Sequence, residues 1–173
     1  MKKIFALFLA VILPIVGFSQ GKFAKFDFLI GNWQGVETGV SGDGIGYRTY
    51  NYELGENYIL EKNQSTFPKS DKKPKGEVHK DIGIFSYDSN KNELIYRSFN
   101  IENFTNIFVL NERESTDTKF AFTTREIENN PGNWKARVII EKISDTEFKE
   151  FFDIAMDGET FQPFLQNHWY KVK

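Results

Sequence analysis

Residues 78–87 read Val-His-Lys-Asp-Ile-Gly-Ile-Phe-Ser-Tyr, and residues 93–101 read Glu-Leu-Ile-Tyr-Arg-Ser-Phe-Asn-Ile. Both stretches are rich in β-branched and aromatic residues, which favour strands. Between them lies Ser89-Asn-Lys-Asn92, a run of typical turn residues. So short a link predicts a hairpin of two antiparallel strands, because a parallel pair needs a crossover of about a dozen residues or more.

The same succession of strand-like and turn-like residues continues along the chain. Only Phe23, Phe26 and Leu29-Ile30 have helical spacing, just before Gly31. Closing a meander of strands removes its exposed edges. We therefore predict an all-β fold, a single antiparallel up-and-down closed β-barrel of about ten strands, with a short N-terminal helix closing one end. The strands are expected at residues 33–40, 46–54, 58–67, 78–87, 93–101, 105–111, 119–127, 134–143, 147–155 and 161–172.

The first 19 residues differ in composition from the rest. Lys2 and Lys3 precede an apolar run from Ile4 to Phe18, and small residues precede a cleavage point after Ser19, as in secretory signal peptides. The run is about fifteen residues long, shorter than the ~20 that a membrane-spanning helix needs. We expect residues 1–19 to be a signal peptide and residues 20–173 to form one barrel domain, without a membrane span, in the periplasm or outside the cell.

Composition narrows the classes of partner. The formal net charge is −2, which argues against nucleic acid or an anionic membrane as the main partner. The chain has no cysteine, so disulfides and thiol catalysis are excluded. Aromatic residues make up 16% of the sequence and suit either a core or an apolar cavity. None of these figures gives the oligomeric state.

Two motifs carry a resemblance to a known group of proteins. Phe28-Leu-Ile-Gly-Asn-Trp-Gln-Gly35 resembles the opening of small calycin-type barrels, which include lipocalins, fatty-acid-binding proteins and nitrobindin-like proteins. In that group the tryptophan plugs one end of the barrel, which implies that Trp33 is a structural plug. His79-Lys-Asp-Ile-Gly-Ile-Phe85 is similar to a strand of nitrobindin-like barrels, and residues 97–104 and 128–137 are similar to an uncharacterised family of secreted bacterial proteins.

Alternate residues of a barrel strand point inward, so this parity and the resemblance together indicate which side chains line the lumen. The mixture of polar and aromatic residues favours a small apolar or amphipathic ligand, with a ligand carboxylate received by an arginine as one option. The leading prediction is therefore a secreted barrel that binds a small molecule in its lumen. The expected lining residues are His79, Asp81, Arg97, Asn106, Arg125 and His168.

A haem protein acting on nitric oxide or peroxynitrite is the alternative that the resemblance implies. Nitrobindins hold haem through the histidine of a Gln-Pro-His sequence on the last strand, whereas this chain has Gln162-Pro-Phe164. Phenylalanine cannot bind iron, and His168 lies about 13 Å farther along an extended strand. Haem would then need a displaced site at His168 or His79, so the leading prediction has no cofactor.

An enzyme is the third alternative. His79 with Asp81 as its orienting partner has the chemistry of a general acid or base, but no G-x-S-x-G nucleophile motif accompanies them. Glu77, His79 and Asp81 are also residue types that bind zinc or iron. Because a catalytic zinc site usually has at least three ligands and supporting partners, the sequence predicts neither catalytic residues nor a metal site.

Overall fold

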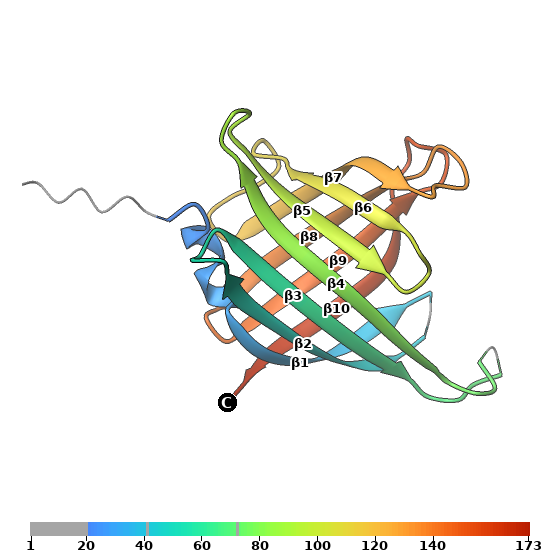
Figure 1. Cartoon of the computed structure of the whole chain (residues 1–173). Coiled ribbons are helices and arrows are strands. Elements are labelled where there is room, and N and C mark those ends of the chain that lie inside the picture. The colour runs from blue at the N-terminus through green and yellow to red at the C-terminus, as the bar shows by residue number, and fades with distance from the viewer. Residues whose placement is uncertain (1–20, 41, 72) are drawn as a thin grey trace, which may run out of the picture.

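The computed structural model describes residues 21–40, 42–71 and 73–173, and the predicted signal peptide lies outside them. Strands β1 to β10 form one closed sheet (Figure 1). This confirms the predicted all-β barrel with about ten strands. The strands are β1 (Gly31–Gly39), β2 (Gly44–Glu53), β3 (Tyr58–Phe67), β4 (Glu77–Asp88), β5 (Glu93–Asn100), β6 (Thr105–Leu110), β7 (Lys119–Glu128), β8 (Lys135–Ser144), β9 (Glu147–Ala155) and β10 (Gln162–Val172).

Every strand pairs antiparallel with its neighbour in sequence, and β1 pairs with β10 to close the barrel. The residues in the turns between strands explain this up-and-down arrangement. Asn92 and Asn129 adopt φ angles of 55° and 60°, in the left-handed region that asparagine tolerates better than most residues. They stand next to β5 and β7, so local residue preferences reverse the chain there.

A short 3₁₀ helix, η1 (Ala24–Leu29), closes one end of the barrel, as predicted (Figure 1). Trp33 at the start of β1 is 1% exposed, and its indole N–H donates to the Leu29 carbonyl oxygen at 2.6 Å. Tryptophan and helix therefore form one plug. Within the residues that the structure describes, no helix is long and apolar enough to cross a membrane.

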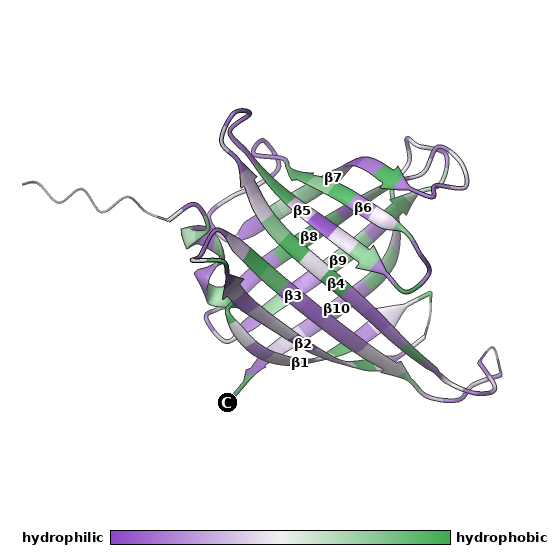
Figure 2. Ribbon diagram, viewed as in Figure 1, coloured by the Kyte–Doolittle hydropathy of each residue, from purple (hydrophilic) through white to green (hydrophobic). Residues whose placement is uncertain are grey.

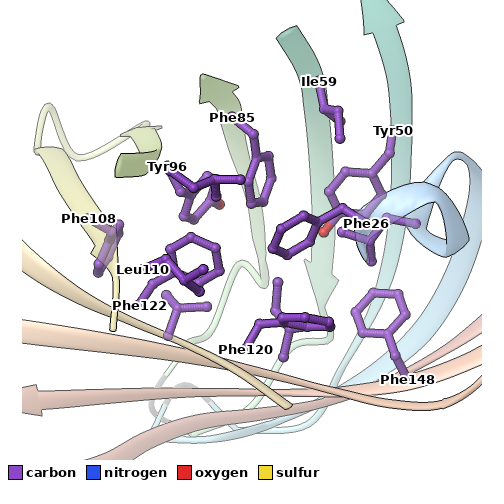
Figure 3. Packing of buried hydrophobic residues seen from close by; sticks show 14 of the residues in the cluster. Phe26, Tyr50, Ile59, Phe85, Tyr96, Phe108, Leu110, Phe120, Phe122 and Phe148 are labelled. Atoms are coloured by element: carbon purple, nitrogen blue, oxygen red, sulfur yellow. The ribbon is translucent and has the colours of Figure 1, made fainter. Parts of the chain in front are cut away.

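The aromatic core lies next to this plug. Phe26 of η1 points between strands of opposite walls, with its ring centroid 4.7 Å from that of Phe120 and 5.8 Å from that of Phe85 (Figure 3). The Tyr96 ring stacks on Phe85 at 4.4 Å. Such rings supply large buried apolar areas, which a domain without disulfides needs.

Two glycines on the inner wall let large side chains lie flat against it. A Cβ atom at Gly46 would lie 2.5 Å from the Trp169 ring, and one at Gly83 would lie 2.7 Å from the Glu61 carboxylate. Both distances are shorter than real contacts allow. The glycines thus make room for the polar cluster described next.

Candidate ligand-binding lumen

A cavity of about 330 Å³ occupies the barrel beyond the aromatic core, a volume at the small end of the range typical of ligand sites. Along β3 the residues change from apolar near the Tyr58 end to polar in the middle of the strand, where the cavity begins (Figure 2). The two walls of the cavity differ in polarity. The polar wall, from β1 to β5, includes Glu37, Arg48, Glu61, Asn63, Ser65, Glu77, His79, Asp81, Ser98 and Asn100. The largely apolar wall, from β7 to β10, includes Ile127, Trp134, Ala136, Val138, Phe152, Ile154, Met156, Phe164 and Leu165.

Arg48 is the centre of the polar wall. It is 6% exposed and pairs with two carboxylates: its Nε lies 3.3 Å from Glu61 Oε1, and its guanidinium also binds Glu150. The Trp169 ring covers the guanidinium carbon at 4.3 Å. The Arg48 Nε also donates to Asn63 Oδ1 at 3.1 Å. All three guanidinium nitrogens therefore donate to protein groups, and Trp169 covers one face of the cation.

Glu61 is 2% exposed and accepts a hydrogen bond from the Tyr96 hydroxyl at 3.0 Å. Burial raises the pKa of Glu61 to about 7, although the Arg48 charge acts in the opposite direction. Burial thus favours the protonated form of this carboxyl more than in an exposed glutamate. The single positive charge of Arg48 does not neutralise both of its carboxylate partners, Glu61 and Glu150.

A chain of hydrogen bonds links the Arg48 cluster to the next carboxylates. Asn63 Nδ2 donates to Ser65 Oγ at 3.0 Å and to Asp81 Oδ2 at 3.3 Å. Ser65 Oγ in turn donates to Glu37 Oε1 at 2.6 Å. Burial raises the pKa of Glu37 above its ordinary value.

His79 stands between carboxylates on the polar wall. Its Nε2 lies 2.9 Å from Asp81 Oδ1, and its Nδ1 lies 2.9 Å from Glu102 Oε1 and 3.8 Å from Glu77 Oε1. The hydrogen bond to Asp81, aided by the carboxylate charges, raises the pKa of His79 to about 9. His79 is therefore a cation at neutral pH.

The same group is the candidate metal centre among the described residues. One ligand atom each from Glu77, His79 and Glu102 can lie within 4.8 Å of the others. Asp81 binds the opposite ring nitrogen, as the outer partner of a metal-bound histidine does. However, a proton on His79 already supplies a positive charge to these carboxylates, so the geometry does not require an ion.

Three of the predicted lining residues do face the cavity. His79 and Asp81 lie on the inner face of β4, and Asn106 lies on the inner face of β6. Asn106 is 5% exposed and donates from Nδ2 to Asn100 Oδ1 at 3.2 Å. The structure thus brings the His79–Asp81 pair and Asn106 to one lumen, as the strand parity predicted.

Arg97 and Arg125 lie on the outer wall, so their predicted place in the lumen is wrong. The Arg97 guanidinium donates to Ser86 Oγ at 2.7 Å, and Arg125 pairs with Glu93. On β5 it is Tyr96 and its alternate neighbours that face inward, which leaves Arg97 outside. On β7 a bulge leaves Arg125 without a partner residue across β6. Neither arginine can receive a ligand carboxylate inside the barrel.

His168 also lies outside the lumen, contrary to the prediction. Its Nε2 is 2.8 Å from Glu147 Oε1, and its ring stacks on Tyr170. Its neighbours Asn167 and Trp169 have the inward positions on β10. A register shift between Pro163 and Leu165 interrupts the alternation that was used to place His168.

Sequence analysis did not identify most of the polar cluster. The available signal was in residues 59–67, where Glu, Asn and Ser alternate between Ile and Phe, and in residues 46–50, where an arginine shares a face with a tyrosine. Polar residues are also common on the solvent-exposed outer face of a barrel, so the alternation alone does not show that these residues point into the lumen. The missed residues include Glu37, Arg48, Glu61, Asn63, Ser65, Glu150 and Asn167.

The lumen does not fit the haem that the resemblance implies. Of the two histidines, only His79 faces the cavity, and its ring nitrogens are held by Asp81 and Glu102. Iron would have to displace the proton that these carboxylates stabilise on the imidazole. The carboxylates around it would also repel the propionates of a haem group. Because its raised pKa keeps His79 protonated at neutral pH, this histidine can donate a proton but is a poor general base.

Comparisons with known proteins identify the fold. No protein-family profile and no curated protein sequence matches the chain. The crystal structure of Rv2717c from M. tuberculosis is similar, with a TM-score of 0.64 and 14% sequence identity over 88% of this chain and 98% of that chain. A redesigned β-barrel has a TM-score of 0.46 and 14% identity over 84% of this chain and 93% of that one. At such identities the likeness to Rv2717c concerns the barrel fold alone.

Proposed function

We propose that this protein is a binding barrel that holds a small amphipathic molecule in its lumen. The observation that carries the proposal is the contrast between the two walls of one cavity, polar on β1 to β5 and largely apolar on β7 to β10, where Glu150 and Asn167 are the polar exceptions. Ligand sites are typically concave and apolar with a few placed polar groups. The resemblance of the sequence to calycin-type barrels supports the same reading.

The apolar wall is where the body of the ligand would lie. Phe152 and Phe164 meet edge to face at 6.0 Å, and both line the cavity with Ile154. Met156, which is 57% exposed, belongs to the same lining and borders solvent. An apolar molecule that displaces water from this wall gains about 25 cal/mol per Å² of apolar surface that it covers.

The test uses N-phenyl-1-naphthylamine, a neutral apolar dye whose fluorescence rises in apolar surroundings. The wild-type protein should bind it with a micromolar Kd. Replacement Ile154→Trp fills the lumen and should weaken dye binding at least tenfold. Lys149→Trp adds the same bulk to the outer face of β9 and should leave binding unchanged. Absence of dye binding by the wild type, or equal binding in Ile154→Trp, refutes the proposal.

A further inference from the structure

The lumen carries far more negative than positive side chains. Among the described residues that line it, the basic ones are Arg48 and His79. Arg48 is held by two carboxylates, and His79 is surrounded by three. The lumen therefore retains an excess of negative charge even when both basic residues are protonated. The six acidic residues of the lining are Glu37, Glu61, Glu77, Asp81, Glu102 and Glu150.

Glu37 is a buried carboxylate of the lumen that has few stabilising partners. It is 3% exposed and lines the cavity. In the described part of the chain, its recorded hydrogen-bond partner is Ser65 Oγ, and it forms no ion pair. A buried carboxylate without a cation is costly unless it takes up a proton or a cation arrives.

Asn167 offers a second unmet group at the same place. It is 3% exposed and lines the cavity, and its Oδ1 has no hydrogen-bond donor in the described structure. Its Nδ2 donates to Glu150 Oε1 at 3.2 Å. A carboxylate only accepts hydrogen bonds, so this contact fixes the amide with Oδ1 as the free acceptor. Buried polar atoms of this kind call for a partner.

Glu37 and Asn167 are direct neighbours. They are opposite each other in the register of β1 and β10, and both face inward. Residues opposite each other on one face of an antiparallel pair have Cβ atoms about 4.5–5.5 Å apart. One donor group can therefore reach both side chains. Among the described residues, the other buried side-chain atom without a partner is the Trp169 indole nitrogen, and Trp169 does not line the cavity. Because Glu37 and Asn167 Oδ1, which do belong to lining residues, both accept hydrogen bonds, the missing partner must donate them.

We propose that the ligand carries an organic ammonium group, bound between the Glu37 carboxylate and Asn167 Oδ1, with its apolar part against the β7 to β10 wall. This inference rests on the proposed function and names the chemical class of the ligand. An ammonium group supplies both the positive charge that Glu37 lacks and the N–H donors that Asn167 lacks. A ligand carboxylate at the same place would meet only acceptors and like charges.

The test compares three probes with the same eight-carbon chain, octylamine, 1-octanol and octanoate, as competitors of N-phenyl-1-naphthylamine at pH 7.5. Octylamine should displace the dye with a Kd at least tenfold lower than that of octanol, and octanoate should be the weakest. Glu37→Gln and Asn167→Leu should each remove most of the preference for octylamine over octanol, with each Kd calculated from the dye affinity measured for that variant.

A control variant separates the Glu37 site from the general negative charge of the protein. Glu126→Gln removes one exposed carboxylate that does not line the cavity. It should keep the preference for octylamine over octanol within threefold of the wild type. An equal loss of that preference in Glu37→Gln and Glu126→Gln overturns the assigned site.

The outcomes also distinguish this inference from the proposed function. Dye binding with equal displacement by octylamine and octanol overturns the ammonium site and leaves the binding barrel in place. If the dye does not bind to the wild type, the proposed function falls, and if octylamine also leaves the intrinsic tryptophan fluorescence unchanged, the ammonium site falls with it. Thermal melts of each variant without ligand verify that Glu37→Gln and Asn167→Leu are folded.

Discussion

Replacement of Arg48 by methionine tests whether the buried charge cluster is organised as described. Methionine keeps much of the length and apolar character of the side chain but removes its charge and its donors. Glu61 and Glu150 then lose their shared cation, and Asn63 loses its donor. Trp169 loses the guanidinium that it covers at 4.3 Å. The perturbation therefore leaves several buried acceptors without partners at once.

The expected loss of unfolding free energy is about 3–5 kcal/mol at pH 7, the range for breaking a buried ion pair from one side. A second argument gives a similar loss of unfolding free energy. A carboxylate that has lost its cation can take up a proton, and for a glutamate of ordinary pKa this costs about 3.7 kcal/mol at pH 7. At pH 5 the same step costs about 1 kcal/mol. The destabilisation should therefore shrink to about 1–2 kcal/mol at pH 5.

Urea denaturation of wild type and Arg48→Met at both pH values measures these differences. The triple variant Arg48→Met, Glu61→Gln, Glu150→Gln removes the stranded charges and should recover most of the loss at pH 7. A loss below about 1 kcal/mol at pH 7, or a loss of equal size at both pH values, refutes the account of the cluster.

Two further predictions concern the plug and the histidine. Trp33→Ala should lower the unfolding free energy by about 3–5 kcal/mol, as large-to-small core changes do, and an unchanged denaturation midpoint would remove the plug argument. Since the folded pKa of His79 is about 9 and its ordinary value is 6.5, its stabilising effect is fully present below pH 6.5 and is lost as pH rises through 9. His79→Gln should therefore lower the unfolding free energy by at most about 3 kcal/mol at pH 6 and by little above pH 9.5. An NMR titration of His79 measures the pKa directly. If the unfolding free energies of wild type and variant differ by the same amount from pH 6 to pH 10, the raised pKa is wrong.

The sequence alone predicted the architecture because its signals there are local. A turn such as residues 89–92 reverses the chain through the conformational preferences of its own residues, whatever the rest of the molecule does. Short turns in succession leave antiparallel pairing as the available arrangement, and closure follows from the need to pair the edge strands. The assignment of residues 1–19 as a signal peptide stays a prediction, because those residues lie outside the described structure.

Strand parity grouped the residues of β4 correctly, although both faces of this strand mix polar and apolar residues. On β4, His79 and Asp81 share a face with Phe85, and all three point inward. On β5 the same reasoning failed, because a period of two gives the grouping of residues but not which group is inside. Phe99, in line with Arg97, is 41% exposed, whereas Tyr96 of the alternate group is buried. The pairing of Tyr96 with Phe85 across β4 and β5 selects the inner face.

The tertiary structure alone decided the chemistry of the lumen. Arg48 comes from β2, Glu61 from β3 and Glu150 from β9, so no local pattern of sequence indicates that they meet. Irregular register in β7 and β10 changes the facing of residues beyond it, because one extra residue exchanges the two faces of a strand. Turns and strands depend on neighbours along the chain, whereas a buried charge is tolerated only by partners that closure of the barrel brings within reach.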